Sequence, residues 1–174
     1  MMMTEVLIVG YGNPLAGDDA AGWRAAEALE ARFRDPAVRV VACRQLTPEL
    51  AEEVARAALV IFLDAGVDAP PGALHCRPVG RPPDAMLFSH QMTPEAVIET
   101  SERLYGRRPE AVLFSVGARS FQAGAGLSSE VERALPVLLD QVCELVKRAL
   151  AARGQSSSSG QPPESEADLF SVMH

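Results

Sequence analysis

Two adjacent carboxylates, Asp18 and Asp19, lie near the end of segment 6–22. This segment has the highest concentration of residues that could take part in catalysis or metal binding. An apolar run at 6–9 leads into a glycine-rich turn, and an amphipathic helix is predicted to open at the two aspartates. The positive N-terminal end of a helix accommodates one carboxylate as a cap. A second carboxylate exceeds what capping needs, so the pair indicates a site directed at a metal ion.

Two more side chains extend this site. Asp64 follows the apolar run 59–63, and His90 lies in the loop 80–92. Ligands of open α/β sheets bind beyond the carboxyl ends of the strands, so we expect Asp19, Asp64 and His90 to meet at one sheet edge. Two carboxylates and an imidazole suit a transition metal and leave positions for water or substrate. Taken singly, each could instead be a cap, a turn former or an ordinary loop histidine.

The elements that must position these residues follow from the apolar pattern. Apolar or β-branched runs predict five strands, at 5–9, 38–41, 59–63, 73–79 and 111–116. Helices are predicted between and after them, starting near residues 18, 47, 93 and 129. The alternation predicts an α/β fold, a three-layer α/β/α sandwich around a mostly parallel, roughly five-stranded twisted sheet.

Two of these helices carry a distinct apolar stripe. In the first helix the predicted stripe consists of Trp23, Ala26, Glu30 and Phe33, with Glu30 at its edge. In the last helix it consists of Val131, Leu135, Leu138, Val142, Leu145 and Ala149, and Pro136 is predicted to kink that helix. From residue 154 onward the chain becomes rich in serine and glutamine. We therefore expect one domain at 1–153 and a disordered tail at 154–174.

Composition narrows the range of partners and compartments. The formal net charge of the 174 residues is −7, which argues against a nucleic-acid partner. No apolar run approaches the length of a membrane helix, and the N-terminus lacks the basic region of a signal peptide. Cys43, Cys76 and Cys143 are odd in number and far apart, which fits free thiols in a reducing compartment. We expect a cytoplasmic protein with no membrane partner.

Other catalytic and cofactor-binding motifs are incomplete or absent in the sequence. Gly10-x-Gly12 begins like a dinucleotide-binding turn, but Leu15 stands where the third glycine belongs. The second predicted strand ends in residues 42–44 without the acid that binds a ribose. The sequence contains no G-x-S-x-G elbow, no H-E-x-x-H and no C-x-x-C.

Taken together, these residues resemble the hydrogenase maturation endopeptidases, which trim the C-terminus of the nickel-loaded large subunit of [NiFe] hydrogenases. Segment 10–22 is similar to the family signature G-x-G-N-x-L-x-x-D-[DE]-x-x-G. Segment 62–65 resembles the family's second aspartate motif, and segment 88–94 resembles its histidine loop. Segments 115–117 and 126–128 resemble the closing strand and the start of the last helix. The resemblance covers about residues 5–150.

The resemblance implies roles for individual residues. It makes Asp19, Asp64 and His90 the catalytic residues and the contacts to the nickel of the substrate. Gly12, Asn13 and Asp18 are implied to bind substrate. Asp19 is one methylene shorter than the glutamate often found at its position.

The turn after the second strand departs from the family. Segment 43–50 lacks the acidic, glycine-rich sequence found in many members. Its Gln-Leu-Thr-Pro form at 45–48 resembles a subgroup that serves soluble bidirectional or cofactor-coupled hydrogenases.

The implied function is an endopeptidase that removes the C-terminal extension of a hydrogenase large-subunit precursor. The resemblance implies no cofactor of its own, because the nickel belongs to the substrate, and we expect a monomer. Water could be activated by the metal or by a carboxylate acting as general base. An aspartic-type dyad would require Asp19 and Asp64 to touch.

Three alternatives remain open from the sequence. One is a non-catalytic nickel-binding maturation chaperone that uses the same three residues. Another is a metal-independent hydrolase or phosphorylase on a similar fold, for which only Arg119 and Ser120 offer an anion-binding set. A dinucleotide-binding module is the weakest.

Overall fold

A computed structural model of the chain describes residues 4–81 and 92–156. Its five strands form one sheet in the order β2-β1-β3-β5-β4. They are β1 (Thr4–Tyr11), β2 (Val38–Cys43), β3 (Ala57–Gly66), β4 (Leu74–Pro78) and β5 (Glu110–Gly117). β1, β2, β3 and β5 run parallel, and β4 pairs antiparallel with β5 at the sheet edge. All five predicted strands and the mostly parallel sheet are confirmed.

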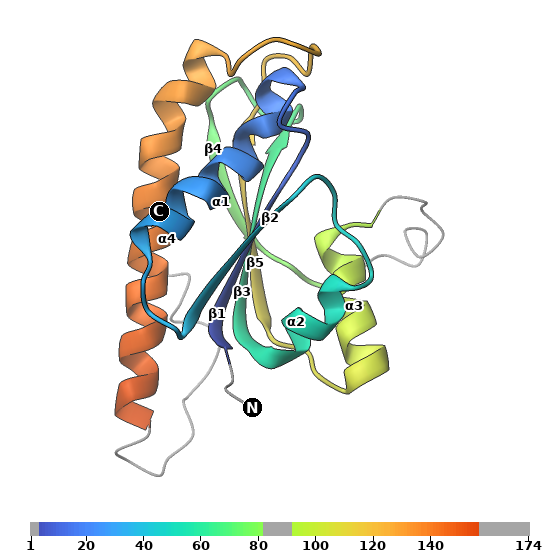
Figure 1. Ribbon diagram of the computed structural model, residues 1–174, viewed down its shortest axis with the longest axis vertical. Coiled ribbons are helices and arrows are strands. Elements are labelled where there is room, and N and C mark those ends of the chain that lie inside the picture. The colour runs from blue at the N-terminus through green and yellow to red at the C-terminus, as the bar shows by residue number, and fades with distance from the viewer. Residues whose placement is uncertain (1–3, 82–91, 157–174) are drawn as a thin grey trace.

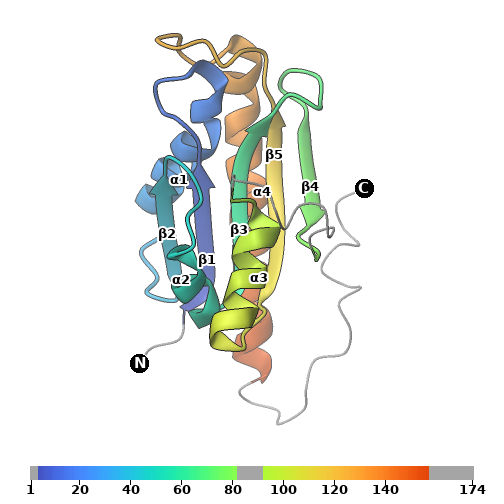
Figure 2. The ribbon, with the colours of Figure 1, turned by 90° about the vertical axis from the view of Figure 1, so that its right-hand side faces the viewer.

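Helices cover both faces of the sheet, so the predicted three-layer sandwich is confirmed. They are the short 3₁₀ helix η1 (Gly17–Ala20) and the α-helices α1 (Ala21–Arg32), α2 (Leu50–Arg56), α3 (Pro94–Tyr105) and α4 (Ser129–Ser156). Figures 1 and 2 show α1 and α4 on one face, with α2 and α3 on the other. None of the helices in the described ranges is both long and apolar enough to cross a membrane.

The three central strands β1, β3 and β5 are mostly apolar because both of their faces are buried. In β1, Val6 and Ile8 join the core under α1 and α4, whereas Leu7 and Val9 join the core under α2 and α3. The same alternation in β3 and β5 extends both cores across the sheet. The three cysteines are free thiols, as predicted.

The predicted stripe of α1 is only partly confirmed, because Ala26 is buried and Phe33 packs against the core, but Trp23 and Glu30 do not belong to the buried face. Its buried residues are Ala21, Gly22, Ala25, Ala26 and Leu29, whereas Glu30 is exposed and Trp23 is only partly buried. A side chain at Gly22 would place its Cβ 2.3 Å from the carbonyl oxygen of Leu63. The helix therefore approaches the strand ends on its smallest residues, and this close approach sets which face is buried.

Neither aspartate is the N-cap of the first α-helix, although capping was one of the interpretations left open by the sequence. Asp18 and Asp19 lie in η1, and the N-cap of α1 is Ala20. Neither N-cap position, Ala16 of η1 or Ala20 of α1, makes a side-chain capping bond. Both carboxylates are therefore available for other contacts.

The predicted stripe of α4 is confirmed. Val131, Leu138, Val142 and Leu145 are buried, and Leu135 and Ala149 pack against the same cores from partly exposed positions. Pro136 lies inside this helix, and the kink expected there stays a prediction. The helix runs to Ser156, three residues beyond the predicted domain end at 153. The rest of the predicted tail, 157–174, lies outside the described residues.

Candidate active site

The glycines of segment 10–22 allow η1 and α1 to lie directly on the strand ends. A Cβ at Gly10 would fall 2.1 Å from the carbonyl oxygen of Gly22. At Gly12, where φ is 137°, a Cβ would fall 1.9 Å from the carbonyl oxygen of Asp19. Only glycine fits this backbone conformation and this contact. The glycine spacing thus brings the two aspartates to the carboxyl end of β1.

Asn13 orients Asp19 within this turn. The backbone N–H of Asn13 donates to Oδ2 of Asp19 at 2.8 Å. The side-chain Oδ1 of Asn13 accepts the N–H of Leu15 at 3.0 Å, which closes the turn. The substrate-binding roles expected for Gly12 and Asn13 stay predictions, but both residues shape the loop that holds Asp19.

Asp18 holds a different loop. Its side chain is buried, and its carboxylate accepts the N–H groups of Arg119 at 2.7 Å, Ser120 at 3.3 Å and Ser128 at 2.6 Å. The hydroxyl of Ser128 donates a fourth bond at 2.9 Å. Burial alone would raise the pKa of Asp18, but the hydrogen bonds from Ser128, Arg119 and Ser120 lower it. The carboxylate therefore fastens segment 119–128 to η1, and its expected contact with substrate stays a prediction.

Asp64 lies inside β3 opposite Ser115, so it continues the strand and does not form a turn. Its Oδ1 accepts the N–H of Ala65 at 2.8 Å, and its Oδ2 accepts the hydroxyl of Tyr11 at 2.8 Å. Burial raises the pKa of Asp64 to about 6, against the opposing effect of these two bonds, and the charge of Asp19 adds to the rise. Burial and the charge of Asp64 also raise the pKa of Tyr11, so its hydroxyl stays a neutral donor.

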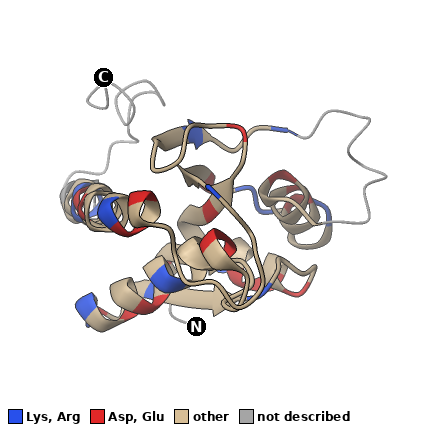
Figure 3. Cartoon of the chain, turned by 90° about the horizontal axis from the view of Figure 1, so that it is seen from above, with Lys and Arg blue, Asp and Glu red and all other residues tan. Residues whose placement is uncertain are grey.

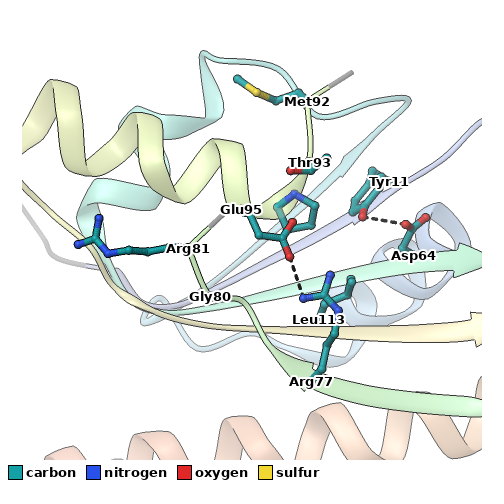
Figure 4. A pocket seen from close by; sticks show the side chains of 10 residues that line it. Tyr11, Asp64, Arg77, Gly80, Arg81, Met92, Thr93, Glu95 and Leu113 are labelled. Atoms are coloured by element: carbon teal, nitrogen blue, oxygen red, sulfur yellow. Dashed lines mark hydrogen bonds and ion pairs between the residues drawn. The ribbon is translucent and has the colours of Figure 1, made fainter. Parts of the chain in front are cut away.

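A cavity of about 540 Å³ opens beside this pair, within the usual size range of ligand pockets. Figure 4 shows the Tyr11–Asp64 pair and the Arg77–Glu95 ion pair lining it. Nη1 of Arg77 lies 2.7 Å from Oε1 of Glu95, a largely buried carboxylate in the first turn of α3. The other lining residues are Gly80, Arg81, Met92, Thr93, Pro94 and Leu113.

Sequence reasoning missed Tyr11, Arg77 and Glu95 as parts of this cavity. The place of Tyr11 between two glycines at the end of β1 was the one available signal. Arg77 and Glu95 are 18 positions apart on a strand and a helix. No local pattern links them.

The structure brings Asp19 and Asp64 to the same edge of the sheet, near enough for the charge of Asp19 to act on Asp64. Figure 3 views the molecule from above, with acidic and basic residues interspersed in the described chain. His90 lies outside the described residues. Within the described ranges, no three His, Cys, Asp or Glu side chains gather into a metal site. The expected set of three metal contacts therefore stays a prediction. Asp19 and Asp64 are at one sheet edge, and His90 is not among the described residues.

No hydrogen bond between the carboxylates of Asp19 and Asp64 is recorded in the described part of the chain. Asp19 accepts its hydrogen bond from the N–H of Asn13, and Asp64 accepts its two from the hydroxyl of Tyr11 and the N–H of Ala65. Each carboxylate is thus presented separately toward the same edge.

Comparison with known proteins identifies the fold family. No protein-family model and no curated protein matches the sequence, but solved structures do. The hydrogenase maturating endopeptidase HybD from E. coli is 27% identical with a TM-score of 0.69, and the match covers 83% of this chain and 93% of that one. An endopeptidase from Escherichia coli is 29% identical with a TM-score of 0.65, covering 86% and 94%. The chain is a homologue of the [NiFe] hydrogenase maturation endopeptidases.

A third neighbour extends the likeness to archaea. The hydrogenase 2 maturation peptidase from Thaumarchaeota archaeon SCGC_AB-539-E09 is 26% identical with a TM-score of 0.62, and the match covers 82% of this chain and 98% of that one. The resemblance inferred from the sequence motifs is therefore confirmed. This maturation endopeptidase homologue is a hydrolase that acts on peptide bonds.

Proposed function

We propose that this endopeptidase removes the C-terminal extension of a [NiFe] hydrogenase large-subunit precursor and that nickel in the precursor is its recognition element. The observation that carries the proposal is Asp64, a partly buried carboxylate on a cavity of ligand-binding size, at the same sheet edge as Asp19. The relatives support the substrate class, because they are named hydrogenase maturation proteases.

The electrostatics of this edge favour a cationic substrate. Burial and the charge of Asp19 both disfavour the anionic form of Asp64. A cation held near both carboxylates would reverse this penalty, because an opposite charge within about 4–6 Å stabilises the ionised form. A nickel-loaded precursor would gain this interaction, and a nickel-free precursor would not. We assign the remaining contact to His90, as the family motif implies.

Hydrolysis needs a water molecule that loses a proton. Asp64 is mostly anionic at neutral pH even without a bound cation, where its pKa is about 6, so its carboxylate can accept that proton as a general base. The substrate nickel could instead acidify the water directly. Both routes keep Asp19 and Asp64 as separate carboxylates, and the observed bonding favours them over an aspartic-type dyad. We further expect a monomer that acts in the cytoplasm without nucleic-acid or membrane partners.

A processing assay tests the proposal. The purified protein is mixed with its cognate precursor, prepared with and without nickel, and loss of the C-terminal extension is followed by mass spectrometry. His90→Ala is compared with His75→Ala, which removes an exposed imidazole from β4. We expect cleavage of the nickel-loaded precursor alone, lost in His90→Ala and retained in His75→Ala.

Two outcomes would contradict the proposal in different ways. Equal cleavage with and without nickel would remove nickel as the recognition element. If a verified nickel-loaded precursor is not cleaved and the protein binds free nickel tightly, the alternative of a non-catalytic nickel-binding chaperone is favoured.

A further inference from the structure

Tyr11 makes the one side-chain hydrogen bond recorded for Asp64 among the described residues. Tyr11 is the last residue of β1, and Asp64 follows Leu63, the partner of Gly10 in the parallel β1–β3 register. The two side chains thus extend from neighbouring strands, and the hydroxyl donates to Oδ2 at 2.8 Å (Figure 4). In this bond the hydroxyl is the donor and the carboxylate oxygen is the acceptor.

The two oxygens of Asp64 receive their hydrogen bonds from different sources. Oδ2 is held by the Tyr11 hydroxyl, and Oδ1 is held by the N–H of Ala65. Two donors on two oxygens fix the rotation of the carboxylate plane, which a single donor would leave free to turn. An ionised carboxylate has about four lone-pair sites, so each oxygen keeps one for a further partner. The bond with Tyr11 therefore restricts the orientation of the Asp64 carboxylate and leaves lone pairs on both oxygens free to accept a further bond.

We propose that Tyr11 is a positioning residue, which holds Asp64 in the one orientation that presents its remaining lone pairs to the nickel-bearing end of the substrate. This inference rests on the proposed function for the identity of that substrate. Asp64 lies on the central strand β3, whereas Asp19 lies in η1 and is oriented by the backbone N–H of Asn13 in the preceding turn. The two carboxylates are thus fixed by different means, one by a side-chain hydroxyl and the other by the shape of the turn.

The chain offers a matched control for this hydroxyl. It has two tyrosines, and Tyr105 at the end of α3 is exposed, with no hydrogen bond recorded for its hydroxyl in the described part of the chain. Tyr11→Phe and Tyr105→Phe each remove one oxygen atom and keep the ring. A difference between the two variants therefore reports the Tyr11–Asp64 contact and not the loss of a tyrosine as such.

Kinetics of precursor cleavage give the first test. We expect Tyr11→Phe to lower kcat about tenfold, the size of effect of one lost hydrogen bond to a charged group, with KM within about twofold. Tyr105→Phe should match the wild type. In an Asp64→Asn background, Tyr11→Phe should cause no further loss, because its effect passes through Asp64. An unchanged kcat in Tyr11→Phe would overturn the proposal, and so would a loss that persists undiminished in the Asp64→Asn background.

Crystal structures of the wild type and Tyr11→Phe give a second readout that needs no activity. We expect the Asp64 carboxylate to rotate away from its wild-type position in Tyr11→Phe. A carboxylate that keeps its place would overturn the positioning role. If the wild type fails to cleave a nickel-loaded precursor but Asp64 rotates in the variant, the proposed function fails and the positioning of Asp64 by Tyr11 stands.

Discussion

Asp18 and Asp64 are both carboxylates set into the same end of the fold, and their surroundings shift their pKa values in opposite directions. Asp18 accepts four hydrogen bonds from segment 119–128, and these lower its pKa despite burial. Asp64 accepts two, beside an open cavity, and burial raises its pKa to about 6. The two pKa values shift in opposite directions because hydrogen bonds replace the lost hydration of the Asp18 carboxylate more completely than that of the Asp64 carboxylate.

The contrast separates a carboxylate that holds a loop, Asp18, from the carboxylate that we propose to be functional, Asp64. The ionised form of Asp18 stabilises the fold, because the loop it holds contributes all of its donors. The ionised form of Asp64 costs stability, since its burial is only partly compensated. The burial of Asp64 is incompletely compensated beside a cavity, so its unused lone pairs are available to a ligand.

The largest effect is expected at Asp18. Asp18→Asn replaces one acceptor oxygen by a donor that faces other donors, so we expect the free energy of unfolding to fall by about 3 kcal/mol. Denaturant unfolding measures the change. Asp68→Asn is the matched control, since Asp68 is exposed on another loop and no hydrogen bond of its side chain is recorded within the described residues. Equal stability of the two variants would contradict the structural role of Asp18.

Asp64→Asn should act in the opposite direction. A pKa raised from 3.8 to about 6 corresponds to roughly 3 kcal/mol of lost stability at neutral pH, so removing the charge should stabilise the fold by up to that amount. Thermal unfolding at pH 7.5 checks this expectation. A clearly less stable Asp64→Asn variant would break the contrast with Asp18.

The pH dependence of stability sharpens the same contrast. The folded state binds a proton at Asp64 more readily than the unfolded state, so this residue's contribution makes stability fall as pH rises from about 4 to 6. Asp64→Asn should lack this slope. The contribution of Asp18 has the opposite sign, since its lowered pKa gives stability that is present above 3.8 and lost as pH falls further. Unfolding curves recorded between pH 3 and 8 measure both.

A smaller effect is expected in the turn that positions Asp19. Gly12→Ala would press a Cβ against the backbone of Asp19 at a φ of 137°, so we expect a loss of about 2 kcal/mol and slower cleavage. Gly126→Ala is the control, because among the described residues no atom beyond its two chain neighbours lies within 4 Å of the added Cβ. If Gly12→Ala retained full stability and activity, the glycine would not be needed to hold Asp19.

Much of the fold follows from the sequence because parallel strands buried on both faces are continuously apolar. Apolar runs such as 59–63 therefore identify the strands in the sequence. The strand topology then places Asp19 and Asp64 at one edge of the sheet. The buried face of α1 could not be predicted from its periodicity. It depends on the contact of Gly22 with Leu63, which is a property of the assembled sheet.

The roles of individual site residues were harder to predict, because their partners are distant in sequence. Asp18 has the local appearance of a helix cap, but its donors lie 101 to 110 positions away. The bond between Tyr11 and Asp64 spans 53 positions and two strands. Neither contact produces a periodic or local motif. The family signature locates the aspartates, but it does not reveal which of them makes its hydrogen bonds to a distant loop of the protein itself.

Cleavage of nickel-loaded precursor by the wild type, Asp64→Asn and Asp68→Asn, with unfolding of each measured alongside, tests the central claim most directly. The account predicts that Asp64→Asn cleaves at least about a hundredfold more slowly than the wild type while its unfolding temperature is equal or higher, and that Asp68→Asn matches the wild type in both. An Asp64→Asn variant that cleaves like the wild type would contradict the assignment of Asp64 as the functional carboxylate.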